Sequence, residues 1–198
     1  MELKQLIKAN RSYRKYEHAI KIEESVILEW IDYARFVSSS KNRQAVRFLV
    51  ITESDQVQCI CNQMQWARHL KGWDGPNKEQ MPSALLIVCT DDTVNNKAET
   101  DVGIITQTLL LQAVNEGFGG CILRSINRKL IREKYKLNEN LKIDMVVALG
   151  KPAQEIILEE MGAGSQACDY WEDENGTHHV PKRAMEDVVI RNIFKDKS

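Results

Sequence analysis

The chain of 198 residues carries 27 Lys and Arg residues against 28 Asp and Glu residues, so its formal net charge is −1. This balance gives no global positive field and argues against a nucleic acid or an anionic membrane surface as partner. The length fits one sizeable hydrophobic core, and we expect a single domain over residues 1–198. Five cysteines, an odd number, fit the reducing cytoplasm better than a disulfide framework, and the first ten residues lack an export signal.

The first third of the chain predicts two helices, a polar loop and a strand. Residues 2–9 place three apolar side chains on one helical face, and residues 25–36 repeat apolar positions at helical spacing. Between these helices, three basic residues surround Ser12 on a loop. The polar run 38–44 predicts a loop dense in hydrogen-bonding groups, followed by a β-branched strand at residues 46–52.

A charge-free helix is the stretch around which the rest of the chain is expected to be built. Residues 102–115 contain no charged side chain and are apolar all round the helical wheel, so we expect burial on nearly every side. The helix is too short to span a bilayer, which leaves a core or a subunit-interface position. We expect Thr100 and Asp101 to cap its start and Gly117 to end it.

Two glycines follow this helix and allow a close approach of the backbone to another group. After Gly119 and Gly120, residues 121–123 predict a short buried strand that ends at Arg124 and Ser125.

Further elements frame this region. A helix opens at residues 54 and 55, residues 69–82 form an ordered loop, and Asn127 caps a helix that runs to residue 136. Continuous apolar runs at residues 84–90 and 143–149 are typical of central strands.

The C-terminal part differs in kind. A short strand at residues 156–158 precedes a flexible link at residues 162–165, and Asn175-Gly176 predicts a two-residue hairpin turn. The last apolar positions predict one helical stripe, which has to pack on the main body or on a second subunit: Met185, Val188, Val189 and Ile193.

The chemistry-bearing residues give no metal site. Cys59 and Cys61 do not face one another on a helix, and the adjacent His178 and His179 point to opposite faces of a strand, where we expect solvent exposure. No phosphate-loop, dinucleotide-binding or hydrolase motif is present. Two basic clusters remain, Arg11 and Arg14 with Ser12, and Lys182 with Arg183. Together they would hold a phosphate dianion, whereas on charge alone two solvated surface patches are the commoner outcome.

Five segments occur in an order and spacing that resemble the FMN-dependent nitroreductase family over nearly the whole chain. They are RSYRKY, SSSKNRQ, DVGIITQTLLLQAVNEGFGG, ALGKP and HHVPKR. The resemblance implies an α+β fold, a three-layer α/β/α sandwich with a central antiparallel sheet. It also implies an intertwined homodimer, in which residues 162–198 reach across to the partner.

The resemblance also implies a set of FMN ligands. Arg11 and Ser12 match phosphate ligands, with Lys182 and Arg183 closing on the same phosphate. Arg14 matches a basic residue near the flavin pyrimidine, where a cation stabilises the charge of the reduced flavin. A loop that contacts the partner's flavin is matched by Ser38, Ser39, Ser40 and Asn42. A turn at the flavin N5 edge is matched by Arg124 and Ser125. The chain departs from the family pattern at Asn10, Ser38 and Ala45.

The implied activity is hydride transfer by FMN, with no catalytic side chain required. NADH or NADPH would reduce the flavin, and a nitroaromatic, quinone or similar small oxidant would then take the hydride by a ping-pong mechanism. Two alternatives stay open. One is other flavin chemistry, such as reductive removal of a ring substituent, and the other is a non-catalytic module that binds or stores flavin.

Overall fold

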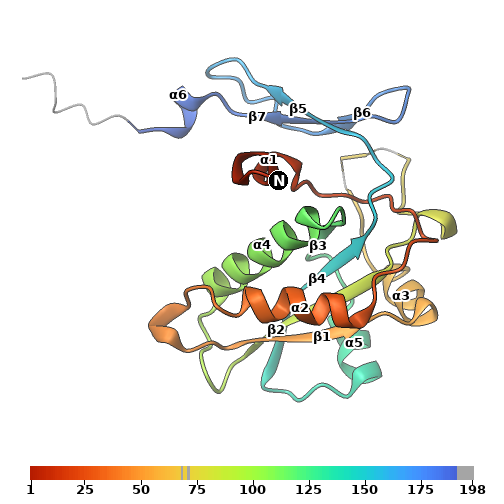
Figure 1. The fold of residues 1–198 in the computed structure, drawn as a ribbon, viewed down its shortest axis with the longest axis vertical. Helices are drawn as coiled ribbons and strands as arrows, with labels where there is room; N and C mark the ends of the chain where they lie inside the picture. Colours follow the sequence, from red (N-terminus) through yellow and green to blue (C-terminus); the bar gives the residue numbers. More distant parts are fainter. Residues whose placement is uncertain (68, 71, 191–198) are drawn as a thin grey trace, which may run out of the picture. The chain divides into compact units, whose positions relative to one another are not determined.

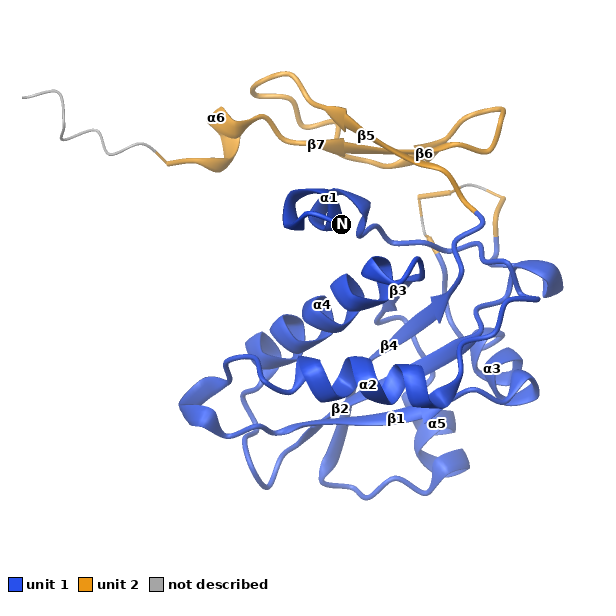
Figure 2. Ribbon diagram, viewed as in Figure 1, with its two compact units in different colours: residues 1–66, 74–153 blue, residues 67–73, 154–198 orange. Residues whose placement is uncertain are grey.

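The structure is a computed structural model, and it describes residues 1–67, 69–70 and 72–190. The chain divides into two compact units, which Figure 2 distinguishes by colour. Residues 1–66 and 74–153 form the first unit, and residues 67–73 and 154–198 form the second. Each unit is described by itself.

A four-stranded antiparallel sheet forms the centre of the first unit. Its strand order is β1 (Val46–Ile51), β2 (Ala84–Asp91), β4 (Leu141–Gly150) and β3 (Gly119–Leu123). The two continuous apolar runs become the central strands β2 and β4, because every residue there faces a covered side of the sheet. The predicted antiparallel sheet is confirmed, and β3 lies at one edge of it.

Helices cover both faces of this sheet. On one face, α2 (Glu24–Ala34) and α4 (Glu99–Asn115) pack through Trp30 and Leu109 onto Leu86 of β2. On the other face, α3 (Ser54–Cys61) contacts β2, and Tyr135 of α5 (Arg128–Tyr135) donates a hydrogen bond to Gln56 Oε1 at 3.0 Å. The arrangement in Figure 1 is the α+β sandwich that the sequence predicts.

The charge-free helix is less buried in the single chain than its composition predicts. One side of α4 packs into the core, whereas Gly103, Ile104 and Gln107 are exposed on the other side. The predicted cap is wrong, because the helix begins one turn earlier than the polar residues suggest and Ala98 holds the N-cap position. Asp101 lies inside the first turn, with a different partner. Gly117 ends the helix in the left-handed conformation, as predicted (φ 79°).

Helix α1 (Leu3–Ala9) contributes no buried residue, although its predicted boundaries are correct. Together with α2 and α4 it lines a groove of about 540 Å³, and Leu6, Tyr33 and Leu111 are among the lining residues.

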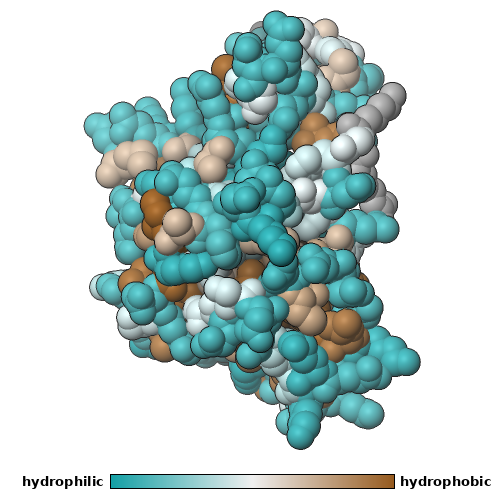
Figure 3. Space-filling view, turned by 90° about the vertical axis from the view of Figure 1, so that its right-hand side faces the viewer, coloured by the Kyte–Doolittle hydropathy of each residue, from teal (hydrophilic) through white to brown (hydrophobic). Residues whose placement is uncertain are grey.

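On the face drawn in Figure 3, hydrophobic residues lie in separate patches among hydrophilic ones. None of the helices in the described part of the chain combines the length and apolar composition needed to cross a membrane.

The second unit contains a three-stranded sheet with β5 (Ile156–Glu160) parallel to β7 (His178–Lys182), and β6 (Trp171–Glu172) antiparallel to β7. The predicted hairpin joins β6 and β7, but its loop spans residues 173–177 instead of two residues. Asp173 causes this difference, because its carboxylate accepts backbone hydrogen bonds from Asn175 and Thr177 at 2.9 and 2.8 Å.

The C-terminal helix is shorter than predicted. Among the described residues after β7, α6 (Met185–Val188) is the only helix, and Val189 is extended. Three consecutive β-branched residues at this point disfavour a longer helix. Met185, Val188 and Val189 are exposed in the single chain, and Ile193 lies outside the described residues.

Candidate functional site

The basic segment after α1 lies along the edge strand of the sheet. Ser12 forms a parallel bridge with Gly120 of β3, and the Tyr13 N–H donates to the Gly120 carbonyl at 3.1 Å. Farther on, Tyr16 bridges to Pro152 and is fully buried. These backbone contacts fix the positions of Arg11, Ser12 and Arg14 relative to β3.

Arg11 is a half-buried cation with no ion-pair partner among the described residues. Its Nη2 donates to the Ile7 carbonyl at 2.8 Å, at the C-terminal end of α1. Its Nε is buried and has no hydrogen-bond partner among the described residues. Burial lowers the pKa of the guanidinium, because the charged form loses hydration. An anion placed here would satisfy the unpaired donor and offset this loss of hydration.

Ser12 and Arg14 both lie close to Cys121 of β3. Burial raises the pKa of the Cys121 thiol, and the charge of Arg14 and a hydrogen bond with the Ser12 side chain partly offset that rise. Arg14 also donates from Nη1 to the Ser12 carbonyl at 3.1 Å. The structure therefore gathers the first basic cluster at the start of β3.

The two close-approach glycines pack against different parts of the chain, Gly119 against the basic segment and Gly120 against β4. A Cβ atom on Gly120 would lie 2.6 Å from the Ala148 carbonyl oxygen, and one on Gly119 would meet the Tyr13 ring. The approach of the turn at Arg124 and Ser125 to a flavin N5 edge stays a prediction.

Arg124 and Ser125 follow the other end of β3, about 13 Å from Gly120 at the rise of an extended strand. The Ser125 carbonyl accepts from the Gln65 N–H at 3.0 Å, which ties this turn to the segment after α3. Arg124 lines a charged cavity of about 420 Å³ together with Glu99 and Lys142. Only an elongated ligand would reach both ends of β3.

The loop of residues 38–44 has an unusual backbone. Lys41, Asn42 and Gln44 all adopt the left-handed conformation, with φ between 50° and 54°. This conformation costs a non-glycine residue about 1–3 kcal/mol, and strain of this kind is concentrated at functional sites. The predicted polar loop is confirmed, and it holds Ser38, Ser39, Ser40 and Asn42 together.

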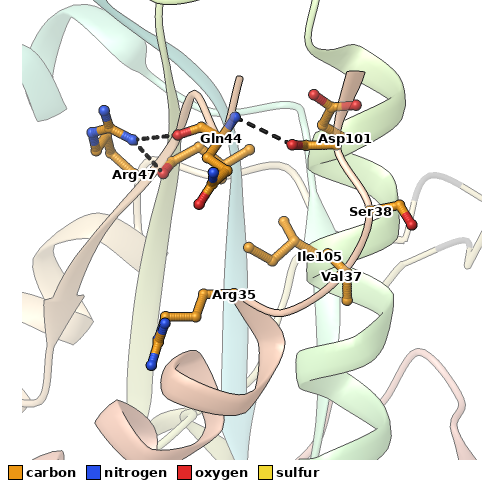
Figure 4. A pocket seen from close by; sticks show the side chains of 9 residues that line it. Arg35, Val37, Ser38, Gln44, Arg47, Asp101 and Ile105 are labelled. Atoms are coloured by element: carbon orange, nitrogen blue, oxygen red, sulfur yellow. Dashed lines mark hydrogen bonds between the residues drawn. The ribbon is translucent and has the colours of Figure 1, made fainter. Parts of the chain in front are cut away.

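A cavity of about 190 Å³ lies between this loop and α4 (Figure 4). Ser38 and Gln44 line it from the loop, and Asp101 and Ile105 line it from α4. The Ser40 N–H donates to both carboxylate oxygens of Asp101, at 3.0 and 3.1 Å. This contact is not among those predicted from the sequence, because Ser40 lies 61 residues before Asp101.

The second basic cluster belongs to the second unit. Lys182 is exposed at the end of β7, and Arg183 donates to the Ser165 carbonyl and to Gln166 Oε1, both at 3.2 Å. That Lys182 and Arg183 bind the same phosphate as Arg11 stays a prediction.

The expectation of solvent exposure for the adjacent histidines is wrong. His178 is fully buried, and the side chain of His179 is only 12% exposed. The His179 ring stacks on Trp171 with 3.9 Å between centroids and 3° between planes, and its Nδ1 lies 2.6 Å from Glu159 Oε1. Within the described residues, no group of three or more His, Cys, Asp or Glu side chains could hold a metal ion.

An antiparallel sheet between two helical layers places the chain among α+β sandwich proteins. The model of the nitroreductase family matches residues 7–151, and the chain therefore belongs to the nitroreductase family.

Solved structures show the same fold. A nitroreductase family protein from Clostridium difficile 630 is 23% identical, with a TM-score of 0.61 over 78% of this chain and 86% of its own. A protein from Exiguobacterium sibiricum 255-15, reported as a nitroreductase in complex with FMN, is 16% identical, with a TM-score of 0.69 over 97% and 98%. An FMN-dependent nitroreductase from Clostridium difficile R20291 is 21% identical, with a TM-score of 0.62 over 76% and 87%.

Proposed function

We propose that this protein is an FMN-dependent oxidoreductase that takes hydride from NADH or NADPH and passes it to a nitroaromatic, a quinone or a similar small oxidant. The observation that carries the proposal is the half-buried Arg11, whose Nε has no hydrogen-bond partner among the described residues. The next residue, Ser12, forms a backbone bridge with Gly120 and so holds this segment along β3. A solved structure of the same fold is reported in complex with FMN, which supports this choice of ligand.

The donor set suits the phosphate of FMN. Arg11 offers a charged fork, and Ser12 offers an exposed hydroxyl next to it. Hydrogen bonds between a guanidinium and a phosphate are charge-assisted and are stronger than neutral ones. Lys182 and Arg183 would add two further cations if the second unit reaches this point.

The chain's own residues would then bind and orient the cofactor. FMN supplies the hydride chemistry at its flavin ring. Arg14, held beside Cys121 by the segment that bridges to β3, would place a cation where the reduced ring carries negative charge. The turn at Arg124 and Ser125 would offer backbone N–H groups to the ring at the other end of β3. The loop of residues 38–44 would contact the flavin of a partner subunit.

A homodimer is the second part of the proposal. The exposed side of α4 borders the groove lined by Leu6, Tyr33 and Leu111, and Leu3 and Ile7 of α1 are also exposed. A second copy of the chain would cover these apolar side chains, and the C-terminal segment would add its own exposed apolar residues to the contact. Localisation in the cytoplasm stays a prediction.

The test is a titration of the purified, flavin-free protein with FMN, followed by the change in flavin fluorescence. We expect saturable binding of one FMN per chain, and competition by inorganic phosphate at high concentration would report the phosphate subsite. Riboflavin, which lacks the phosphate, should bind at least about tenfold more weakly. Equal affinity for both ligands, or no binding, would contradict the proposal.

A further inference from the structure

The contact between Ser40 and Asp101 joins two elements that are far apart in the sequence. Asp101 is only 4% exposed, and both of its carboxylate oxygens lie within hydrogen-bond distance of the Ser40 N–H. The carboxylate sits in the first turn of α4, where the free N–H groups of the helix favour a negative charge. These groups and the Ser40 N–H stabilise the buried carboxylate.

Inside the loop, the remaining hydrogen bonds are local. The Asn42 N–H donates to the Ser39 carbonyl at 2.9 Å, the Arg43 N–H to the Ser40 carbonyl at 3.0 Å, and the Gln44 N–H to Ser39 Oγ at 3.2 Å. These bonds stay within the loop. At the end of the loop, Arg47 of β1 donates to the Gln44 carbonyl at 2.8 Å, so the loop is tied to β1 there and to α4 at Ser40. The left-handed residues on either side of Arg43 make the shape costly to maintain. The hydrogen bond from Ser40 to Asp101 ties the middle of this loop to a rigid helix.

We propose that Asp101 is a positioning residue, which acts through Ser40 to hold the strained loop of residues 38–44 in the shape that contacts FMN. The inference rests on the proposed function, because it takes the loop to be part of the flavin site. Asp101 does not itself touch the cofactor. Its effect on FMN is transmitted by one hydrogen bond from the loop backbone.

The test compares three variants of the full chain. Asp101→Ala removes the acceptor, whereas Asp101→Asn keeps an amide oxygen that can accept the Ser40 N–H. Glu99→Ala is the matched control, because it removes a carboxylate from the same helix turn that pairs with Lys142 at 2.9 Å and not with the loop. The readouts are hydrogen exchange of the loop amides, the dissociation constant of FMN, and the visible circular dichroism of bound FMN.

We expect Asp101→Ala to speed exchange of the Ser40, Asn42, Arg43 and Gln44 amides, to raise the FMN dissociation constant roughly tenfold, and to change the flavin dichroism. Asp101→Asn should restore all three, and Glu99→Ala should leave them unchanged. Should Asp101→Ala fail to fold, Ser40→Pro removes the same hydrogen bond from the loop side. Ser40 is the first residue of a 3₁₀ turn (Ser40–Asn42), a position that suits proline.

Two results would overturn the inference. One is unchanged exchange in Asp101→Ala, since the loop would then keep its shape without the acid. The other is faster exchange with unchanged FMN affinity and dichroism, since the loop would then not position the flavin. A wild-type chain that binds no FMN would instead overturn the proposed function, and the exchange measurement would still decide whether Asp101 holds the loop.

Discussion

A Cβ atom placed on Gly119 would lie 2.5 Å from Cδ2 of Tyr13, so the tyrosine ring occupies the space that any other side chain would need. Tyr13 stands between Ser12 and Arg14, and its hydroxyl donates to the Ala9 carbonyl at 2.8 Å. The packing of one aromatic ring on one glycine therefore sets where the basic segment crosses the edge of the sheet.

Gly119→Ala should displace the Tyr13 ring and lower the free energy of unfolding by about 1–3 kcal/mol, as overpacking does in a filled site. FMN affinity should fall in parallel, because Arg11, Ser12 and Arg14 move with the ring. Urea unfolding and an FMN titration measure the two effects. Gly162→Ala is the control, since no atom lies within 4 Å of its added Cβ. Equal behaviour of the two variants would show that the ring adapts freely.

Several elements could be predicted because the signal for each is local. The apolar runs of β2 and β4 are buried on both faces wherever they lie in a sheet of this kind. Asn127 caps α5 through the Leu130 N–H, three residues away, as its sequence position indicates. The loop of residues 38–44 likewise needed only its own polar composition.

The missed features depend on partners that are distant in sequence. The sequence predicts Asp101 to cap the helix, but its partner is Ser40, which lies 61 residues earlier. His179 was expected in solvent, but Trp171 and Glu159 come from two other strands and cover it. No local pattern identifies such partners, because they come from elements that are distant in sequence.

Arg11→Ala should weaken FMN binding by about tenfold or more, because a charge-assisted hydrogen bond is worth roughly 1.5–3 kcal/mol. Arg11→Lys is the matched variant, which keeps the charge but loses the planar fork, and it should fall between wild type and alanine. Lys182→Ala should also weaken binding. FMN titrations decide this, and unchanged affinity in both alanine variants would show that the two clusters do not meet on the phosphate.

His179 predicts a pH dependence of the second unit. Burial by itself would lower the pKa of His179, but hydrogen bonds with Glu159 and Asp173 outweigh that effect and raise the pKa above 6.5. Because the folded-state pKa is the higher one, this stabilisation is fully present below about pH 6.5 and is lost as the pH rises through the folded pKa. NMR titration of the imidazole measures that pKa directly.

Glu159→Gln should lower the pKa of His179 and flatten the pH dependence of unfolding. Glu160→Gln is the control, because the next residue of β5 points to the opposite face of the strand. A His179 that titrates at the same pH in wild type and Glu159→Gln would contradict this interpretation of the contact.

Removal of the chain after Arg183 should weaken the proposed homodimer while keeping the basic cluster. Met185, Val188, Val189 and Ile190 are exposed in the single chain, and burial against a partner contributes roughly 1.5–3 kcal/mol for each large aliphatic side chain before ordering costs. Light scattering with excess FMN measures the oligomeric state. A truncated protein that stays fully dimeric at micromolar concentration would exclude the tail from the interface.

The most direct test of the central claim is anaerobic reduction of the FMN-loaded protein, followed through the visible absorbance of the flavin. We predict that NADH or NADPH bleaches the flavin band, and that a nitroaromatic or a quinone added afterwards restores it in the absence of oxygen. A panel of oxidants, including a ring-substituted aromatic, separates the alternatives within flavin chemistry. A bound flavin that neither reduced nicotinamide bleaches would contradict the account and would favour a module that binds flavin without turnover.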